Sequence, residues 1–485
     1  MVAPRSAPRR RARAYDAIAM LDLPSSALAI AAFIHRRELS AVEVVDHYLA
    51  VIERRNPALA ALIGVRAGGA RRAAVDADRQ LARGAPSSPL FGLPTAIKDD
   101  QSLRGHPTRV GTRVLDWAWS PIDGVTARAC RRAGLIPLAK SATSELAILP
   151  IVDLPGRPPT RNPIDPSRYA GGSSGGAAAA VAGGLLPIAP GSDGAGSIRI
   201  PAAFCGVVGF MPSLGLVSTR GALPLSWSYD RIGPLTHDVH DAALVLAAIA
   251  GYDADDVCSQ PLAVADYPAA VAAGPRRLRV GVPRAQLYVE LDPEVEAAVA
   301  RALAALTELG AELREVSLPL DDDRTVFRAE AWAYHRDHVA RAPERYQAET
   351  LRRLRTGESV TAAAYLERAR ELVRVRRAYA AALADLDLVV APTVAVPAPT
   401  FTEVDAAPDE LRARELVFMR TTRPFSVWGA PALSVPCGAT RAGLPIGVTL
   451  AGAHGADAAV LAAGAALART LPPSLVDRPL PPLPR

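Results

Sequence analysis

The chain has 485 residues, of which 50% are hydrophobic and 21% are charged; this composition is typical of a globular protein and excludes a disordered one. The net charge of +6 is modest for that length and does not indicate a nucleic-acid-binding protein. Length alone would allow about three ordinary domains. No apolar run approaches the roughly 20 residues that span a bilayer, so we expect no membrane association.

Much of the positive charge lies in the stretch RSAPRRRAR, within a predicted basic N-terminal tail of residues 1–24. No aromatic side chains alternate with its arginines, so we interpret it as a solvated leader. Asp16 and Asp22 interrupt the place where the apolar region of a signal peptide would follow. The four scattered cysteines form no CxxC pair, which argues against a zinc site or a disulfide scaffold and favours a reducing compartment. We therefore expect a cytoplasmic protein.

Helical patterns dominate the first part of the chain, and a buried strand follows them. Ser40 and Glu43 form a capping-box pattern, after which apolar residues recur at helical spacing up to residue 55. Residues 90–97 are predicted to form a buried strand with Lys98 at its end. The other elements expected here are helices at 28–35 and 69–83 and a strand at 59–65.

Helices and strands then alternate, which predicts an α/β protein with a mixed, largely parallel twisted sheet covered by helices on both faces. We expect one large domain over residues 25–470, a helical excursion within it at 322–384, and a Pro-rich tail at 471–485. The expected helices are 126–133, 176–182 and 294–309, and the expected strands are 135–139, 185–188, 278–282, one ending near 318, 388–390, 432–435 and 446–450.

Lys98 in the stretch FGLPTAIKDD is the first candidate for chemistry, because lysine is almost never fully buried without a reason. Burial disfavours the charged form and lowers the pKa of a lysine, and a neutral lysine is a competent general base near pH 7. The alternative is an ion pair with Asp99 or Asp100 at the strand end. Both interpretations remain open at this stage.

A first cluster of small residues, GGSSGG, contains Ser173 and Ser174. Such a run is often a flexible linker, but here it leads directly into AAAAVAGGLLPIAP, which has the pattern of a packed helix and strand. The cluster also matches GxSxG, the nucleophile elbow of α/β-hydrolases, a motif that needs a preceding strand. The residues before it, RNPIDP, cannot form a central strand, so the elbow is a poor explanation.

A second cluster, GSDGAGS, covers residues 191–197 and ends on Ser197. Successive small residues can turn several backbone N–H groups toward one point, as an oxyanion hole requires. A phosphate cradle would use similar geometry, but no GK[ST] follows and the Rossmann glycine pattern is absent. Asp193 and Arg199 flank the turn with opposite charges and are expected to hold its shape as an ion pair.

With these residues in view, the sequence resembles the amidase signature family. GLPTAIKDD looks like the lysine motif of that family, and RNPIDPSRYAGGSSGG followed by GSDGAGSIRIPAAFCG looks like its glycine/serine signature. The likeness extends over roughly residues 28–467. It implies the amidase signature fold and the hydrolysis of a carboxylic amide to an acid and ammonia or an amine, without a metal or an organic cofactor.

The resemblance also implies a role for each matching residue. Ser197 would attack the amide carbonyl, Ser173 would relay its proton, and neutral Lys98 would be the general base, with a cis peptide before Ser173. Ser174, like Asp193 and Arg199, would support the site. The oxyanion would be stabilised by the backbone N–H groups of Gly194, Ala195, Gly196 and Ser197.

Several positions depart from the usual pattern of the family. Ala195 stands where glycine is commoner, and Met211 and Leu216 replace basic residues; these changes affect the expected substrate and leave the catalytic residues intact. Trp227, Tyr229 and Trp428 are candidate pocket aromatics, with core packing as the alternative. His335 and His338, three residues apart, are interpreted as a helix-surface coincidence.

Three functions are considered. The first is a stand-alone amidase that acts on a small or medium amide, with a homodimer left open as its assembly. The second is the A subunit of a tRNA-dependent amidotransferase, which would generate ammonia from glutamine for a separate partner. The third is a catalytically silent binding protein on the same fold, which the intact Lys98, Ser173 and Ser197 disfavour.

Overall fold

A computed structural model describes residues 21–84, 86, 88–115, 119–151, 157–276, 278–406 and 411–471. Nearly all of the predicted basic tail and of the predicted Pro-rich tail lie outside the described residues, so both tail boundaries stay predictions. The capping box is present, because Ser40 accepts from the Glu43 N–H and the Glu43 side chain accepts in return from the Ser40 N–H.

The described strands form one sheet of eleven strands in the order β1-β3-β2-β4-β6-β5-β10-β11-β9-β7-β8. The strands are β1 Leu62–Ile63, β2 Pro94–Lys98, β3 Ile136–Ser141, β4 Ile188–Ser192, β5 Val208–Met211, β6 Ile232–Thr236, β7 Arg279–Val282, β8 Glu312–Glu315, β9 Leu388–Pro392, β10 Ala432–Ala439 and β11 Pro445–Ala451.

The sheet is mixed, as expected, but it is parallel only in its two flanks. The pairs β3–β2, β2–β4, β9–β7 and β7–β8 are parallel, and every pair from β4 across to β9 is antiparallel. The sequence analysis missed β5 and β6, and a short connection joins β10 to β11, which favours antiparallel pairing. The expectation of a largely parallel sheet is therefore corrected for its centre.

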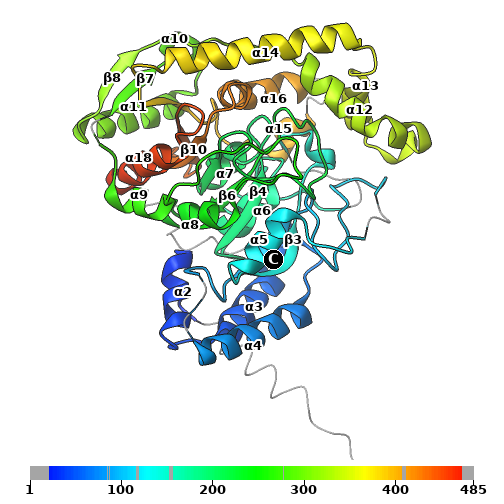
Figure 1. The fold of residues 1–485 in the computed structure, drawn as a ribbon, viewed down its shortest axis with the longest axis vertical. Helices are drawn as coiled ribbons and strands as arrows, with labels where there is room; N and C mark the ends of the chain where they lie inside the picture. The colour runs from blue at the N-terminus through cyan, green and yellow to red at the C-terminus, as the bar shows by residue number, and fades with distance from the viewer. Residues whose placement is uncertain are drawn as a thin grey trace, which may run out of the picture.

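Helices cover this sheet and extend beyond it at both ends of the molecule (Figure 1). The three N-terminal helices lie at one end, and the helices of the excursion lie at the other (Figure 1). The helices are α2 Ala27–His35, α3 Ala41–Leu59, α4 Ala67–Arg83, α5 Val125–Arg132, α6 Gly175–Ala182, α7 Arg199–Cys205, α8 Val239–Ile249, α9 Tyr267–Ala273, α10 Arg284–Leu287, α11 Pro293–Glu308, α12 Thr325–Arg341, α13 Ala348–Arg355, α14 Ala362–Ala382, α15 Phe401–Asp405, α16 Leu411–Met419, α17 Arg423–Val427 and α18 Asp457–Thr470, with short 3₁₀ turns η1 Glu145–Ala147 and η2 Pro343–Arg345.

Both faces of the sheet carry helices, as β10 shows. The side chains of Leu433 and Val435 point at α18, where a Cβ on Gly464 would touch both of them. Ser434 points the other way, toward the side on which a Cβ on Gly447 would also meet Ala203 of α7. Because neighbouring residues of a strand face opposite sides, α7 and α18 lie on opposite faces of the sheet.

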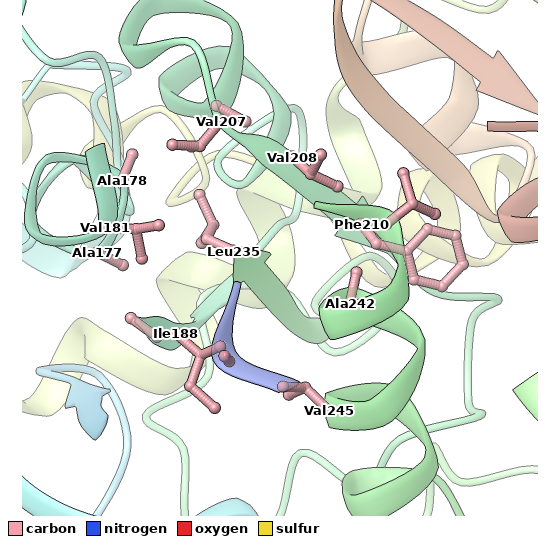
Figure 2. Close-up of a cluster of buried hydrophobic side chains, with 14 of the residues drawn as sticks. Ala177, Ala178, Val181, Ile188, Val207, Val208, Phe210, Leu235, Ala242 and Val245 are labelled. Atoms are coloured by element: carbon pink, nitrogen blue, oxygen red, sulfur yellow. The ribbon is translucent and has the colours of Figure 1, made fainter. Parts of the chain in front are cut away.

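The core beside the glycine–serine clusters is built from small and branched side chains. Figure 2 shows residues of α6 and α8 on either side of strand residues such as Leu235 and Ile188. Every residue of α6 is buried, and alanines fill most of the helix. Small side chains let α6 pack closely against β4 and α7, which brings the two clusters together.

Two predicted strand boundaries are wrong in an informative way. The strand expected at 185–188 is β4, which begins at Ile188 and continues through Gly191 and Ser192, because all five of its residues pair with β6. The strand expected at 59–65 shrinks to β1, because α3 continues through Leu59. The expectation of an almost wholly helical stretch at 322–384 is confirmed by α12, α13 and α14.

Candidate active site

Lys98 is the last residue of β2 and is fully buried. Its Nζ lies 2.7 Å from Ser173 Oγ and 2.7 Å from Ser192 Oγ. The same Nζ is 3.4 Å from Asp100 Oδ2, which forms an ion pair. Burial lowers the pKa of Lys98, and the negative charge of Asp100 opposes that shift. Both interpretations of Lys98, the buried amine beside a serine and the partner of an aspartate, therefore describe this structure.

The first cluster leads from a loop into α6. Ser173 is buried and follows a cis Gly172–Ser173 peptide, as the resemblance implies. The next residue, Ser174, reaches the second cluster: its Oγ donates to Ser192 O at 3.0 Å, and its N–H donates to Ser197 O at 3.0 Å. These bonds hold the two clusters side by side.

Asp193 and Arg199 form a fully buried ion pair within the second cluster, with Arg199 Nε 2.9 Å from Asp193 Oδ2. Burial alone would raise the pKa of Asp193, but the guanidinium and the surrounding N–H donors outweigh burial and hold that pKa below its ordinary value. Arg199 also donates to Thr422 O at 2.7 Å and to Ser426 Oγ at 2.9 Å. The expected ion pair is thus present, and it ties the turn to a distant segment of the chain.

The backbone N–H groups of the second cluster divide into two sets. Gly196 N–H donates to Asp193 Oδ1 at 2.6 Å, because a buried carboxylate needs hydrogen-bond donors. The expectation that Gly196 supplies an oxyanion donor is therefore corrected. Among the described residues, the N–H groups of Gly194, Ala195 and Ser197 make no hydrogen bond within the chain. These three groups remain available to a ligand.

Ser197 and Ser173 line the same cavity but differ in exposure. Ser197, two residues before α7, is half-buried, whereas Ser173 is fully buried. No hydrogen bond joins the two hydroxyls in the part of the chain that the structure describes. The structure therefore places Lys98 against Ser173 and leaves Ser197 as the more accessible serine of the cavity.

Two residues of the cavity were missed in the sequence analysis. Ser192 Oγ lies 2.5 Å from Asp100 Oδ2, so this serine connects the aspartate to Lys98. Asp230 accepts the N–H groups of two residues in the preceding loop, and burial raises its pKa to about 7. Ser192 had one signal, its place inside the second cluster, while no local pattern marked Asp230.

The cavity has a volume of ≈ 300 Å³, which is at the small end of ligand-binding pockets. Trp227 and Tyr229 line it, whereas Trp428 belongs to the core and stacks on Tyr379 with ring centroids 4.4 Å apart. Of the positions that depart from the family pattern, Ala195 lines the cavity. The other two, Met211 and Leu216, are buried in hydrophobic clusters.

The remaining sequence features lie away from this cavity. His335 is buried in α12, and within the described residues no group of three or more His, Cys, Asp or Glu side chains is placed to hold a metal ion. All four cysteines are free thiols. None of the helices in the described ranges combines the length and the apolar character needed to cross a membrane.

Comparison with known proteins assigns this chain to a family. The family model described as Amidase matches residues 43–461. An amidase from Pseudomonas putida is 38% identical over 416 residues, which cover 84% of this chain and 88% of that protein. The A subunit of the glutamyl-tRNA(Gln) amidotransferase from Anaeromyxobacter dehalogenans is 35% identical over 467 residues, covering 90% of this chain and 94% of that protein.

Solved structures give the same result for the fold. A bacterial aryl acylamidase of the amidase signature family matches with a TM-score of 0.83 and 28% identity, covering 94% of this chain and 99% of that one. Sequence and fold therefore agree over most of the chain, including β2 and both glycine–serine clusters. This chain belongs to the amidase family and is an enzyme that hydrolyses amide bonds.

Proposed function

We propose that the enzyme cleaves a carboxylic amide through an acyl-enzyme on Ser197, with Ser173 as the proton relay and Lys98 as the general base. The observation that carries this proposal is the 2.7 Å contact between Lys98 Nζ and Ser173 Oγ, in a cavity that Ser197 also lines. In this proposal the proton would pass from the nucleophile Ser197 through the relay Ser173 to the buried base Lys98.

In the first half-reaction, Ser197 Oγ attacks the carbonyl carbon and its proton passes to Ser173. The proton of Ser173 passes at the same time to the lone pair of neutral Lys98. When the tetrahedral intermediate collapses, the C–N bond breaks and the proton returns through Ser173 to the leaving nitrogen. Water then attacks the Ser197 ester through the same relay, and the carboxylic acid is released.

Neutral Lys98 is favoured by burial, which lowers its pKa. Ser192 orients the amine, since its hydroxyl oxygen lies 2.7 Å from Nζ while its proton is directed at Asp100. A neutral amine has two protons, so one can point at Ser192 while the lone pair faces Ser173. Ser192 and Asp100 are thus positioning residues for the base.

The oxyanion of the intermediate would be held by the backbone N–H groups of Gly194, Ala195 and Ser197. Removing one donor from such a site typically costs about 10²–10³ in rate. Gly196 contributes indirectly, because its N–H anchors the turn to Asp193. The ion pair with Arg199 keeps that anchor charged and fixed.

A second candidate function is the glutaminase component of a tRNA-dependent amidotransferase. The observation that favours it is the 35% identity to the amidotransferase protein from Anaeromyxobacter dehalogenans over 90% of this chain. The two functions differ in what they require: the amidase acts alone on its amide, whereas the glutaminase would release ammonia from glutamine for a partner. Hydrolysis of glutamine by the isolated chain, compared with that of other amides, separates them.

We infer further that the enzyme works in the cytoplasm on a small-molecule amide, without nucleic acid, membrane or cofactor. The proposed cytoplasmic location is supported by the four free cysteines, which are typical of a reducing compartment. Sedimentation of the purified chain would decide between a monomer and the homodimer considered from the sequence.

The test of the mechanism is labelling with a fluorophosphonate, read by intact mass and peptide mapping. We expect one adduct on Ser197 in the wild type, none in Ser197→Ala, and strongly slowed labelling in Lys98→Ala. An adduct on Ser173 would identify Ser173 as the nucleophile in place of Ser197 and would contradict the proposal. No adduct on the folded wild type would contradict it as well.

A further inference from the structure

One wall of the active-site cavity carries six arginines from helices far apart in the sequence. The residues of this arginine wall come from the N-terminus of α12, from α13, and from the segment that holds α16 and α17. They are Arg324, Arg328, Arg352, Arg353, Arg412 and Arg423.

The positive charge of the arginine wall is only partly balanced. Four of its members share three carboxylates, and in the described ranges the side chains of Arg324 and Arg328 form no ion pair or hydrogen bond. The nearby carboxylate on the same wall, Asp323, is engaged elsewhere, since Arg368 Nε lies 3.3 Å from it. The pairs are Arg352–Glu349 at 2.7 Å, Arg353–Glu349 at 2.6 Å, Arg353–Glu415, Arg412–Glu415 at 3.4 Å and Arg423–Asp322 at 3.0 Å.

Arg324 lies in the part of the wall where positive charges repel one another, and among the described residues it has no carboxylate partner. Burial lowers its pKa to about 9, and the charges of neighbouring arginines such as Arg353 and Arg423 act in the same direction. A guanidinium nevertheless stays charged under all ordinary conditions. The wall thus presents a positive charge that lacks its counterion. Arg328 is exposed, so water can stabilise its unpaired charge. Arg324 is half-buried beside four like charges, so water stabilises its charge less.

We propose that the arginine wall binds an anionic group of the substrate, so that this amidase acts on small amides that carry a carboxylate in addition to the scissile amide. The proposal rests on the proposed function, because the same cavity holds Ser197 and the arginine wall. A guanidinium suits this role because it binds a carboxylate through two parallel N–H···O bonds.

Affinity for matched anionic and neutral ligands tests the proposal without relying on turnover. Ser197→Ala would be titrated calorimetrically with two pairs of compounds. Succinamate against succinamide places the charge on the acyl side, and N-acetylglycine against N-acetylglycinamide places it on the amine side. We expect at least one anion to bind about tenfold to a hundredfold more tightly than its neutral partner, the range of a charge-assisted hydrogen bond.

Arg324→Gln, introduced into Ser197→Ala, should reduce that ratio of affinities to near one. The matched control is Arg336→Gln, an exposed arginine of the same helix whose neighbour is Asp337 and which does not line the cavity. The control should keep the full ratio. The ratio should also fall as salt is raised, because screening weakens attraction between charges.

Two results would overturn the inference, and they are distinguishable from a failure of the mechanism. Equal affinity for both members of each pair, in a protein whose wild type is labelled on Ser197, would remove the anion site and leave the amidase mechanism standing. Anion binding that depends on Arg324, in a protein never labelled on Ser197, would instead overturn the proposed chemistry and with it the role of the anion as substrate.

Discussion

The cavity is bounded by two regions that differ in whether their charged side chains have partners of opposite charge. On the floor of the site, built from β2, β4 and the two clusters, each charge has a partner: Lys98 meets Asp100, and Asp193 meets Arg199. On the arginine wall, four of the six guanidinium groups share three carboxylates, and within the described residues the other two form no ion pair. A site whose charges are balanced internally is positioned without a ligand, which suits catalysis. A wall with unbalanced charge is suited to selecting a ligand.

The largest expected effect is a loss of kcat on replacing Lys98, a buried lysine of the floor. Lys98→Met should lower kcat by about 10²–10⁴, the range for losing a general base. In the wild type the base must be neutral, so kcat/KM should fall as pH decreases through the pKa of Lys98, which burial has lowered. The variant should lose that limb of the pH profile, as measured by steady-state kinetics.

Lys140→Met is the matched control for this prediction. Lys140 is also fully buried, and its Nζ lies 3.2 Å from Asp99. Ser141 is in register with Lys98 on the neighbouring strand, so these two side chains point to the same face of the sheet. Lys140 precedes Ser141 in its strand and therefore points to the opposite face. The control should lose stability while each folded molecule keeps its kcat. Equal losses of kcat in both variants would mean that Lys98 serves structure alone.

The next prediction compares the buried ion pair of the floor with an ion pair of the wall whose carboxylate is exposed. Asp193→Asn should cost about 3–5 kcal/mol of unfolding free energy, because it leaves Arg199 buried without its counterion. Asp322→Asn removes the carboxylate partner of Arg423, but Asp322 is 97% exposed. That change should cost less than about 1 kcal/mol. Urea unfolding of both variants gives the comparison, and similar costs would contradict it.

The same contrast explains what the sequence could and could not reveal. Lys98, Ser173 and Ser197 could be proposed from the sequence because each stands in a short stretch whose composition is unusual: a lysine in an apolar strand, or serines among glycines. The bond from Gly196 N–H to Asp193 was not foreseen, since it depends on the exact path of a turn. Ser192 was assigned to that turn, although β-pairing with β6 makes it the end of a strand.

Longer-range features left no local pattern at all. β5 and β6 consist of VGFM and IGPLT, where glycine and proline argue against strands, and pairing with neighbours overrides that preference. The helices of the excursion were predicted from the sequence, but no role was assigned to their arginines. Only the fold brings Arg324 and Arg423 to one cavity, so neither segment by itself predicts the wall.

A third, smaller effect tests how tightly the floor is built. Gly196 has φ 132°, and a Cβ there would lie 2.4 Å from Thr422 Oγ1. Gly196→Ala should therefore cost about 1–3 kcal/mol and slow the reaction, because the turn that carries Ser197 must shift. Gly84→Ala is the control: its backbone is extended, and a Cβ would meet nothing within 4 Å. Thermal unfolding and kcat of the two variants decide the point.

The smallest effect should have the opposite sign, and it belongs to the wall. Arg324→Gln removes a positive charge that is repelled by its neighbours, so the ligand-free protein should gain a few tenths of a kcal/mol, or at most about 1 kcal/mol, of stability. The gain should shrink in high salt, and Arg336→Gln should leave stability unchanged. Thermal unfolding at two salt concentrations measures this. A loss above about 1 kcal/mol would mean that Arg324 has a structural role. Such a loss would place Arg324 with the paired charges of the floor, and the contrast between the two regions would no longer hold.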